Sequence, residues 1–281
     1  MNPASLDLEV CSTAGELVQV CADGLDVHIT APVKVFNRYS LAATRGSRAL
    51  GTKAHSAAAR CIALSRSELQ PQPLFVQREG VVSAGMGTST ADTIAAALTH
   101  AKLTGIVLER HQLIRLVSSV ERSDGIFHDG ICLVQQGVGR LLKRLPARPW
   151  RLVLLVPRTR LTTERARPYA KQFRQAYADI LHSVRADHSD GDLIDCINLS
   201  AWINATVRDY EFYFDVRRRA RALSADGVGI AHTGSLVFLI YRDSETFESI
   251  KPKLIRALRS RYRLDRLICA EFAFKSWKWT A

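Results

Sequence analysis

The sequence lacks the features that mark membrane and secreted proteins. No apolar run reaches the roughly 18 residues that a membrane-spanning helix needs. The first residues, MNPASLDLEV, show no basic segment followed by an apolar core, so no secretory signal is expected. The six cysteines are scattered without a C-x-x-C pair, which excludes the usual zinc spacings and a disulfide framework. The expected compartment is the cytoplasm.

Acidic residues are few relative to basic ones: 27 Asp and Glu stand against 39 Lys and Arg, a net charge of +12. Such a surplus indicates a nucleic-acid partner, an anionic substrate or only a basic surface. The densest basic stretches, Arg217–Arg221 and Arg256–Arg266, are expected to be helices with solvated faces. No aromatic RNA-binding motif or zinc-finger spacing accompanies them. Neither nucleic acid nor a membrane is therefore expected as a partner, while a homodimer stays open.

The chain of 281 residues, 47% apolar and 23% charged, has the composition of a globular enzyme with one large domain or two lobes. Its first half begins strand-rich, through about residue 80, and continues with two helical patterns, Thr90–Leu103 and Arg110–Glu121. A strand, a tight turn and a second strand are then predicted before a proline-containing linker at Leu141–Trp150. The predicted boundary between residues 1–146 and 147–281 lies in this linker.

The second half mixes short buried strands with helical patterns. The expected strands are residues 151–157, 236–241 and 269–274, and the expected helices are residues 162–186, 194–207, 215–223 and 244–259. Pro252 argues for a break in the last helix or for a late first turn. The irregular alternation in both halves predicts an α+β fold with helices on one face of each sheet.

A glycine-hydroxyl loop at residues 85–90 is the most informative local feature. Gly85 and Gly87 permit close approach of the backbone to a phosphate, and Met86 lies between them. Thr88, Ser89 and Thr90 open a predicted helix, whose first N–H groups and dipole favour an anion. Ser89 or Thr90 could place a hydroxyl on Mg²⁺. The loop is neither a Walker A motif nor a dinucleotide fingerprint, and helix capping by the hydroxyls is an equal alternative.

Three weaker sites accompany this loop. Glu121 and Asp124 lie in an acidic turn after a helix, where a carboxylate could hold a metal or take a proton from a hydroxyl. The late loop at residues 231–235 precedes an apolar strand and could bring backbone N–H groups to an anion. Glu16 follows a small-residue turn between two strand-like runs. An ordinary turn or an exposed carboxylate is the better explanation of each of these sites when it is taken alone.

The order of these sites along the chain resembles that of the GHMP small-molecule kinases, a family that includes galactokinases, homoserine kinases and mevalonate kinases. The resemblance is strongest to the L-threonine kinase branch, which is linked to cobalamin biosynthesis and propanediol utilisation. The matching residues, all quoted from this sequence, are Gly15-Glu16-Leu17-Val18-Gln19, Gly85-Met86, Ser89-Thr90-Ala91-Asp92, Asp124-Gly125 and Ala231-His232-Thr233-Gly234-Ser235.

The resemblance implies a two-lobed α+β fold, with an S5-like N-terminal lobe and a ferredoxin-like C-terminal lobe, and ATP and Mg²⁺ between them. It implies that residues 85–90 wrap the triphosphate, that Ser89 and Glu121 hold the metal, and that Asp124 is the catalytic aspartate. It also implies that Glu16 and the loop of His232, Thr233, Gly234 and Ser235 line the acceptor side. The implied reaction transfers phosphate from ATP to the side-chain hydroxyl of L-threonine or a related hydroxy-amino acid.

The sequence departs from the family pattern just before the phosphate loop. Val81 and Ser83 stand where a proline and a glycine are usual, and Ala84 replaces a lysine common in the threonine-kinase branch. Lys34 also alters the proline–acid strand that follows the first motif. These changes keep two alternatives open: a kinase of this family for another small alcohol, such as a homoserine-like or pathway-specific one, or a non-catalytic ATP- or nucleic-acid-binding regulator.

Overall fold

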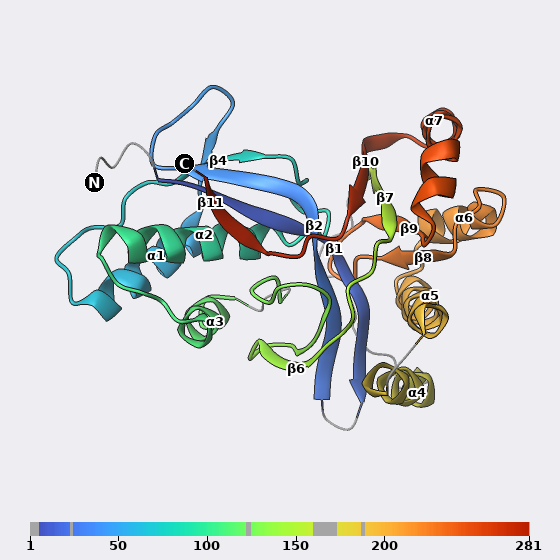
Figure 1. Ribbon diagram of the computed structural model, residues 1–281, viewed down its shortest axis with the longest axis horizontal. Helices are drawn as coiled ribbons and strands as arrows, with labels where there is room; N and C mark the ends of the chain where they lie inside the picture. The colour runs from blue at the N-terminus through green and yellow to red at the C-terminus, as the bar shows by residue number, and fades with distance from the viewer. Residues whose placement is uncertain (1–5, 23–24, 122–124, 160–172, 187–188, 281) are drawn as a thin grey trace.

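The computed structural model describes residues 6–22, 25–121, 125–159, 173–186 and 189–280. It consists of two antiparallel sheets, with helices packed against both (Figure 1). The strands of the first sheet are β1 (Asp7–Ala22), β2 (Leu25–Ser40), β3 (Arg48–Ala49), β4 (Phe75–Arg78), β5 (Cys132–Gln135), β6 (Arg140–Arg144) and β11 (Trp277–Thr280). Those of the second sheet are β7 (Arg151–Pro157), β8 (Gly227–Ile230), β9 (Val237–Tyr241) and β10 (Leu264–Glu271).

The helices lie between these strands along the chain, partly in consecutive groups. They are α1 (Thr52–Ser65), α2 (Thr88–Leu103), α3 (Arg110–Ser118), α4 (Arg174–Arg185), α5 (Asp190–Val207), α6 (Glu211–Ala220) and α7 (Ser244–Arg261). The strand order is β11-β1-β2-β4-β3 in the first sheet, with β5 on β2 and β6 on β5, and β10-β7-β9-β8 in the second. The predicted α+β class is confirmed.

The long hairpin of β1 and β2 belongs to both halves of the molecule. Its register shifts between Thr13 and Val18, and Gly15 there has a φ of +81°. A bulge with a left-handed glycine bends a strand, so the hairpin changes direction at this point. The open end of the hairpin, formed by the start of β1 and the end of β2, packs on α1, α2 and α3. The end that carries the turn between the two strands reaches α4 and α5 (Figure 1).

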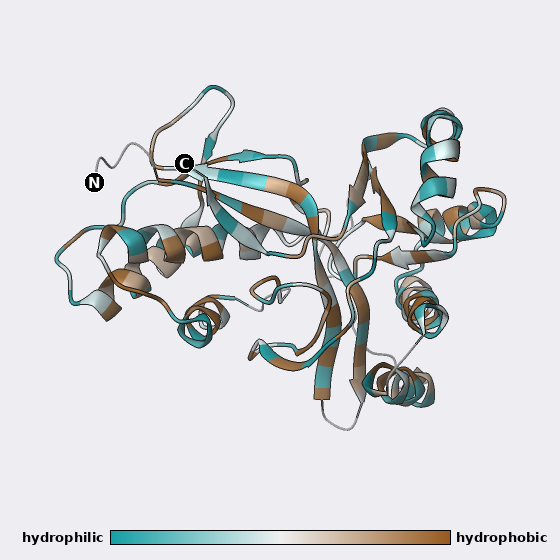
Figure 2. Cartoon of the chain, in the orientation of Figure 1, coloured by the Kyte–Doolittle hydropathy of each residue, from teal (hydrophilic) through white to brown (hydrophobic). Residues whose placement is uncertain are grey.

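The second sheet is covered on both faces because its central strand is apolar throughout. In β7, Leu152, Leu154 and Val156 face the core shared with the β1–β2 hairpin, whereas Val153 and Leu155 face α6 and α7. This alternation follows from the two-residue repeat of a strand. Figure 2 shows both apolar and polar residues on α4 and α5, as expected for helices with one face on a core.

The chain crosses between the two sheets a second time near its C-terminal end. After β10, Phe272 makes an isolated bridge to Val33. β11 then pairs with β1 in the first sheet, where Val10 lies opposite Trp277. A strand from the predicted second range, 147–281, therefore completes the sheet that residues of the predicted first range, 1–146, otherwise form.

Several local expectations differ from the structure. Residues 52–65, within the stretch expected to be strand-rich, form α1, because alanines there pack on α2. Residues 141–144 of the expected linker are the end of β6. Pro252 neither breaks nor starts a helix: α7 runs through it, with Phe247, Leu254 and Leu258 buried. The lost backbone hydrogen bond falls on the exposed side of α7, where water can replace it.

Candidate functional site

The glycine-hydroxyl loop leads directly into α2. Gly85 and Gly87 have φ values of +86° and +65°, and Gly87 is the N-cap of the helix. Thr88, not Thr90, is therefore the first helical residue. The N-cap position is occupied by a glycine, and the three hydroxyl residues lie inside the first turn of the helix. The first N–H groups of α2 point outward with the positive end of the helix dipole, which suits an anion.

Three loops from distant parts of the sequence meet at this point. A Cβ on Gly15 would lie 2.6 Å from the Cβ of Ala231, and one on Gly85 would lie 2.5 Å from the same atom. A Cβ on Gly234 would lie 2.3 Å from the backbone of Ala84. The Leu236 N–H donates to the Ala84 carbonyl at 3.0 Å. Only glycine fits where backbones approach so closely, which explains the glycines of all three motifs.

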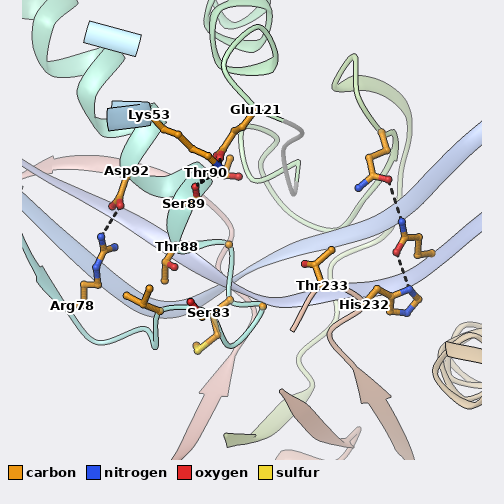
Figure 3. A pocket seen from close by; sticks show the side chains of 16 residues that line it. Lys53, Arg78, Ser83, Thr88, Ser89, Thr90, Asp92, Glu121, His232 and Thr233 are labelled. Atoms are coloured by element: carbon orange, nitrogen blue, oxygen red, sulfur yellow. Dashed lines mark hydrogen bonds and ion pairs between the residues drawn. The ribbon is translucent and has the colours of Figure 1, made fainter. Parts of the chain in front are cut away.

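A cleft of about 670 Å³ opens beside this meeting point (Figure 3). It is lined by residues of β1, α1, β4, α2 and the late loop, from both halves of the molecule. The lining residues are Gln19, Lys53, Arg78, Val82, Ser83, Gly85, Met86, Gly87, Thr88, Ser89, Thr90, Asp92, Glu121, Gln136, His232 and Thr233. All six residues of the predicted phosphate loop are among them.

The two predicted metal ligands lie together at one end of the cleft. The Ser89 hydroxyl donates to Glu121 Oε2 at 2.6 Å, and Lys53 Nζ lies 2.6 Å from the same oxygen (Figure 3). The Thr93 hydroxyl also reaches Glu121 Oε1, at 3.4 Å. The Glu121 side chain is only 5% exposed, and Lys53 is its ion-pair partner. A hydroxyl and a carboxylate so placed have the chemistry of a Mg²⁺ site.

Ser89 and Glu121 are two oxygen ligands of the kind that bind Mg²⁺ together with other groups. No group of three or more His, Cys, Asp or Glu side chains comes together among the residues that the structure describes. In nucleotide sites, Mg²⁺ is usually held by one or two protein oxygens, with phosphate and water supplying the rest. Ser89 and Glu121 could supply such a pair. Asp124, the predicted catalytic residue, lies outside the described residues.

The Asp92 carboxylate is bound by two side chains of the protein. Arg78 Nη2 donates to Asp92 Oδ2 at 2.6 Å, and the Tyr39 hydroxyl donates to Oδ1 at 2.8 Å. Burial raises the pKa of Asp92, although both partners act in the opposite direction. These contacts join α2 to β4 and β2. Asp92 thus holds the helix that carries the phosphate loop.

Glu16 lies behind the late loop and is fully buried. Its carboxylate accepts the His232 backbone N–H at 3.1 Å and the Thr233 hydroxyl at 3.3 Å. Of the predicted acceptor residues, His232 and Thr233 line the cleft. Gly234 packs on Ala84 behind the loop.

A buried arginine that sequence analysis missed holds the other side of this loop. Arg208 donates to the carbonyls of Ala231 at 2.9 Å and His232 at 3.3 Å, and also to that of Gly234. Burial lowers the pKa of its guanidinium. Ser235 is fully buried, and its carbonyl accepts the Tyr210 hydroxyl at 2.6 Å. A carboxylate on the N–H side and a guanidinium on the carbonyl side therefore fix the loop backbone.

The His232 imidazole is neutral. Its Nδ1 lies 3.0 Å from Gln19 Oε1 and its Nε2 lies 3.4 Å from the Ser200 hydroxyl. Burial, followed by the charge of Arg208, lowers its pKa to about 3. The Gln19 amide also contacts the side-chain amide of Gln136, with 3.1 Å between Gln19 Nε2 and Gln136 Oε1. This end of the cleft therefore presents neutral hydrogen-bonding groups.

Several site residues carried no recognisable motif. Lys53, Arg78 and Gln136 reach the cleft from α1, β4 and the turn after β5. Their spacing to the loop depends on how the elements pack, which no local pattern encodes. The alanine-rich run around Lys53 is a helical signal that could have placed it on a helix.

The chain shares its fold with solved small-molecule kinases and with a decarboxylase. Homoserine kinase from Cytophaga hutchinsonii has a TM-score of 0.69 at 13% identity, over 99% of this chain and 98% of that one. Mevalonate kinase from Methanococcus jannaschii has a TM-score of 0.70 at 11% identity, over 97% and 99%. Mevalonate diphosphate decarboxylase from Staphylococcus aureus has a TM-score of 0.72 at 9% identity, over 98% of both chains.

Sequence comparison is less informative than structure here. No family model matches the chain, and no curated protein sequence matches it. None of the helices in the described residues is long and apolar enough to cross a membrane. The structural likeness, which extends over nearly the whole length of both chains, confirms the predicted architecture: the chain has the two-lobed α+β fold of the GHMP small-molecule kinases.

Proposed function

We propose that this protein is an ATP-dependent kinase of the GHMP superfamily that phosphorylates a hydroxyl of a small metabolite. The observation that carries the proposal is the meeting of the glycine loop, the Ser89–Glu121 pair and the late loop at one cleft. Each part alone has an ordinary structural explanation. Together they offer backbone N–H groups for phosphates, oxygens for a divalent cation and hydrogen-bonding groups for an acceptor.

The chain's own residues have distinct tasks in this proposal. The N–H groups at the start of α2 bind and orient the phosphates, and Glu16 and Arg208 hold the late loop against them. Mg²⁺, held by Ser89 and Glu121, would neutralise negative charge on the phosphates. Asp124 is assigned by sequence resemblance to orient the acceptor hydroxyl and take its proton. The two lobes exclude water from the cleft.

L-Threonine and related hydroxy-amino acids are the first acceptors to test, because the sequence motifs most resemble the threonine-kinase branch. A second class is favoured by the neutral groups at the other end of the cleft. Gln19, Gln136 and the uncharged His232 suit hydroxyls and amides. Small neutral alcohols and homoserine-like compounds therefore belong in the same panel.

The test is ATP turnover with this acceptor panel, together with the mass of the product. We expect one acceptor to gain a single phosphoryl group as ATP becomes ADP. MgATP at 100 times its Kd should also stabilise the fold by about 2.7 kcal/mol. ATP binding without conversion of any acceptor would contradict a kinase and favour a binding protein on this fold.

The role of Asp124 has its own test. Asp124→Asn should lower kcat by about 10² to 10⁴-fold, the usual contribution of a general base, and leave the ATP affinity unchanged. Asp195→Asn, which removes an exposed carboxylate on α5, is the matched control and should keep full activity. An Asp124→Asn enzyme as fast as the wild type would remove this residue from the mechanism.

A further inference from the structure

Lys53 stands out in the cleft because it faces the position expected for a metal. Its Nζ lies 2.6 Å from Glu121 Oε2 and 3.3 Å from the Ser89 hydroxyl. These are the same two oxygens that are expected to hold Mg²⁺. An ammonium and a divalent cation at the same carboxylate repel each other, so binding of the divalent cation competes with the Lys53–Glu121 ion pair.

The position of Lys53 on its helix is electrostatically unfavourable unless an anion is near. Lys53 is the second residue of α1, whose first turn contains no acidic residue. A cation at a helix N-terminus is repelled by the helix dipole. The first turn of α2 also lacks an acidic residue. Glu121 supplies the compensating charge in the structure.

Other charges around the cleft cannot take the place of Lys53. Arg78 Nη2 is held by Asp92, which is also bound by Tyr39, and His232 is neutral. The Lys53 side chain, by contrast, is 57% exposed and ends a flexible four-carbon stem. Among the described residues that line the cleft, Lys53 is the cation that can move.

We propose that Lys53 is a phosphate-binding residue that exchanges between two anions. It pairs with Glu121 when the cleft is empty, and it turns to the triphosphate when a nucleotide binds, which leaves Glu121 available to a divalent cation. The inference rests on the proposed function, because it places the triphosphate at the start of α2. It adds a cation on α1 that none of the sequence motifs includes.

The exchange has two measurable consequences. The Lys53 charge should support ATP binding even without a metal, since an ammonium–phosphate contact is a charge-assisted hydrogen bond. The same charge should weaken binding of Mg²⁺ to the protein without nucleotide, since the metal must displace it from Glu121. A purely structural Lys53–Glu121 ion pair predicts neither effect on ATP.

The experiment measures ATP binding by calorimetry, in EDTA and in Mg²⁺, for Lys53→Met, Lys53→Arg and the wild type. Lys53→Met should weaken metal-free ATP binding by about tenfold. Mg²⁺ alone should bind this variant more tightly than it binds the wild type. Lys53→Arg, which keeps the charge, should bind metal-free ATP within a few-fold of the wild type. Lys102→Met removes an exposed lysine at the other end of α2 and should change nothing.

A second measurement uses the unmodified protein and so does not depend on how a variant folds. Acetylation of Lys53 by an amine-specific reagent, followed by mass spectrometry, should slow when ATP is added in EDTA, whereas Lys102 should react at the same rate. Equal ATP affinity for Lys53→Met and the wild type, or no protection of Lys53, would overturn this inference alone. A wild-type protein that binds no ATP under either condition would overturn the proposed function as well.

Discussion

At the scale of single residues, the site consists of charges and backbones held by buried partners. Sequence resemblance assigned Ser89 and Glu121 to one site, and the structure brings them within 2.6 Å. Their role as metal ligands stays a prediction. Glu16 was expected on the acceptor side, and the structure shows that its carboxylate binds the backbone of the late loop. A motif thus indicated which residues meet, while packing decided what each one contacts.

His232 should make the stability of the protein depend on pH. Its pKa falls from 6.5 to about 3 on folding, so the folded state favours the neutral imidazole. The stabilisation is complete above about pH 6.5 and is lost as the pH falls toward 3. Between these values the group contributes up to about 1.4 kcal/mol per pH unit.

The measurement is urea unfolding between pH 7.5 and 4.5 for the wild type and His232→Gln. As the pH falls, the free energy of unfolding of the variant should decrease less steeply than that of the wild type, by the slope that corresponds to about one bound proton. Both proteins should keep some slope, since burial also lowers the pKa of His100 and His128. His111→Gln, at an exposed position on α3, should behave as the wild type does. Parallel curves for His232→Gln and the wild type would contradict the prediction.

Ser83 is a strained residue in front of the phosphate loop. Its φ is +62°, a left-handed conformation that glycine adopts easily and other residues do not. This is the position where the sequence departs from the glycine usual in the family. Ser83→Gly should therefore be more stable than Ser83→Ala by about 1 kcal/mol in chemical denaturation.

An exposed serine elsewhere provides the control for Ser83. Ser67 also lies in a loop, and it does not have a positive φ. There the order should reverse, with Ala more stable than Gly by about 0.4 to 1 kcal/mol, because glycine gains more freedom on unfolding. The same order at both positions would show that strain at Ser83 does not affect stability.

At the scale of elements, the site depends on how closely three loops pack. Ala231 lies between Gly15 and Gly85, and any larger side chain there would push two backbones apart. Ala231→Val should destabilise the protein by about 1 to 3 kcal/mol through overpacking. It should also weaken ATP binding, although Ala231 is not among the residues that line the cleft, because it displaces the phosphate loop.

The matched control is Ala205→Val, since Ala205 is equally buried but lies in the core between α5, α6 and the second sheet. It should lower stability by a similar amount and leave ATP affinity unchanged. Thermal unfolding and ATP calorimetry test both variants. Unchanged ATP affinity in Ala231→Val would show that the loops do not need this packing.

The elements themselves were predictable where their pattern is local. The buried strand β7, the α2 helix and the β5–β6 hairpin all match the sequence expectation. Helix α1 was missed, and Pro252 was taken as a break or as part of a late first turn, because both depend on tertiary packing that overrides local preference. The sequence showed the motifs that contain Gly15, Gly85 and Gly234, but not that these three glycines lie close together.

At the scale of the whole molecule, two features join the lobes. The bent β1–β2 hairpin contributes to two cores, and β11 returns to pair with β1. Neither was predicted, because antiparallel pairing between segments far apart in the sequence leaves no local pattern. Trp277 anchors this last strand by packing on the core beneath α1 and α2, and the Arg110 guanidinium lies 5.0 Å from the centre of its ring.

Trp277→Ala should therefore destabilise the protein by about 2 to 3 kcal/mol, as expected for a large packed side chain. Deletion of residues 277–281 should destabilise it further, because the pairing of β11 with β1 is lost too. Lys278→Ala, next to it on the same strand, removes an exposed lysine from Glu9, which keeps its ion pair with Arg38, and should change stability by less than about 1 kcal/mol. Urea unfolding measures all three, and a Trp277→Ala protein as stable as Lys278→Ala would contradict this role.

The pairing of β11 with β1 also has a consequence for synthesis on the ribosome. Val10 is synthesised long before its partner Trp277, because the two residues lie far apart in the sequence. Throughout elongation, the N-terminal strand therefore presents an unpaired edge, the kind of surface from which strands of different chains associate. Slow translation of the second half prolongs this exposure. A nascent chain of this protein is accordingly expected to need protection of this edge by chaperones until β11 has been synthesised.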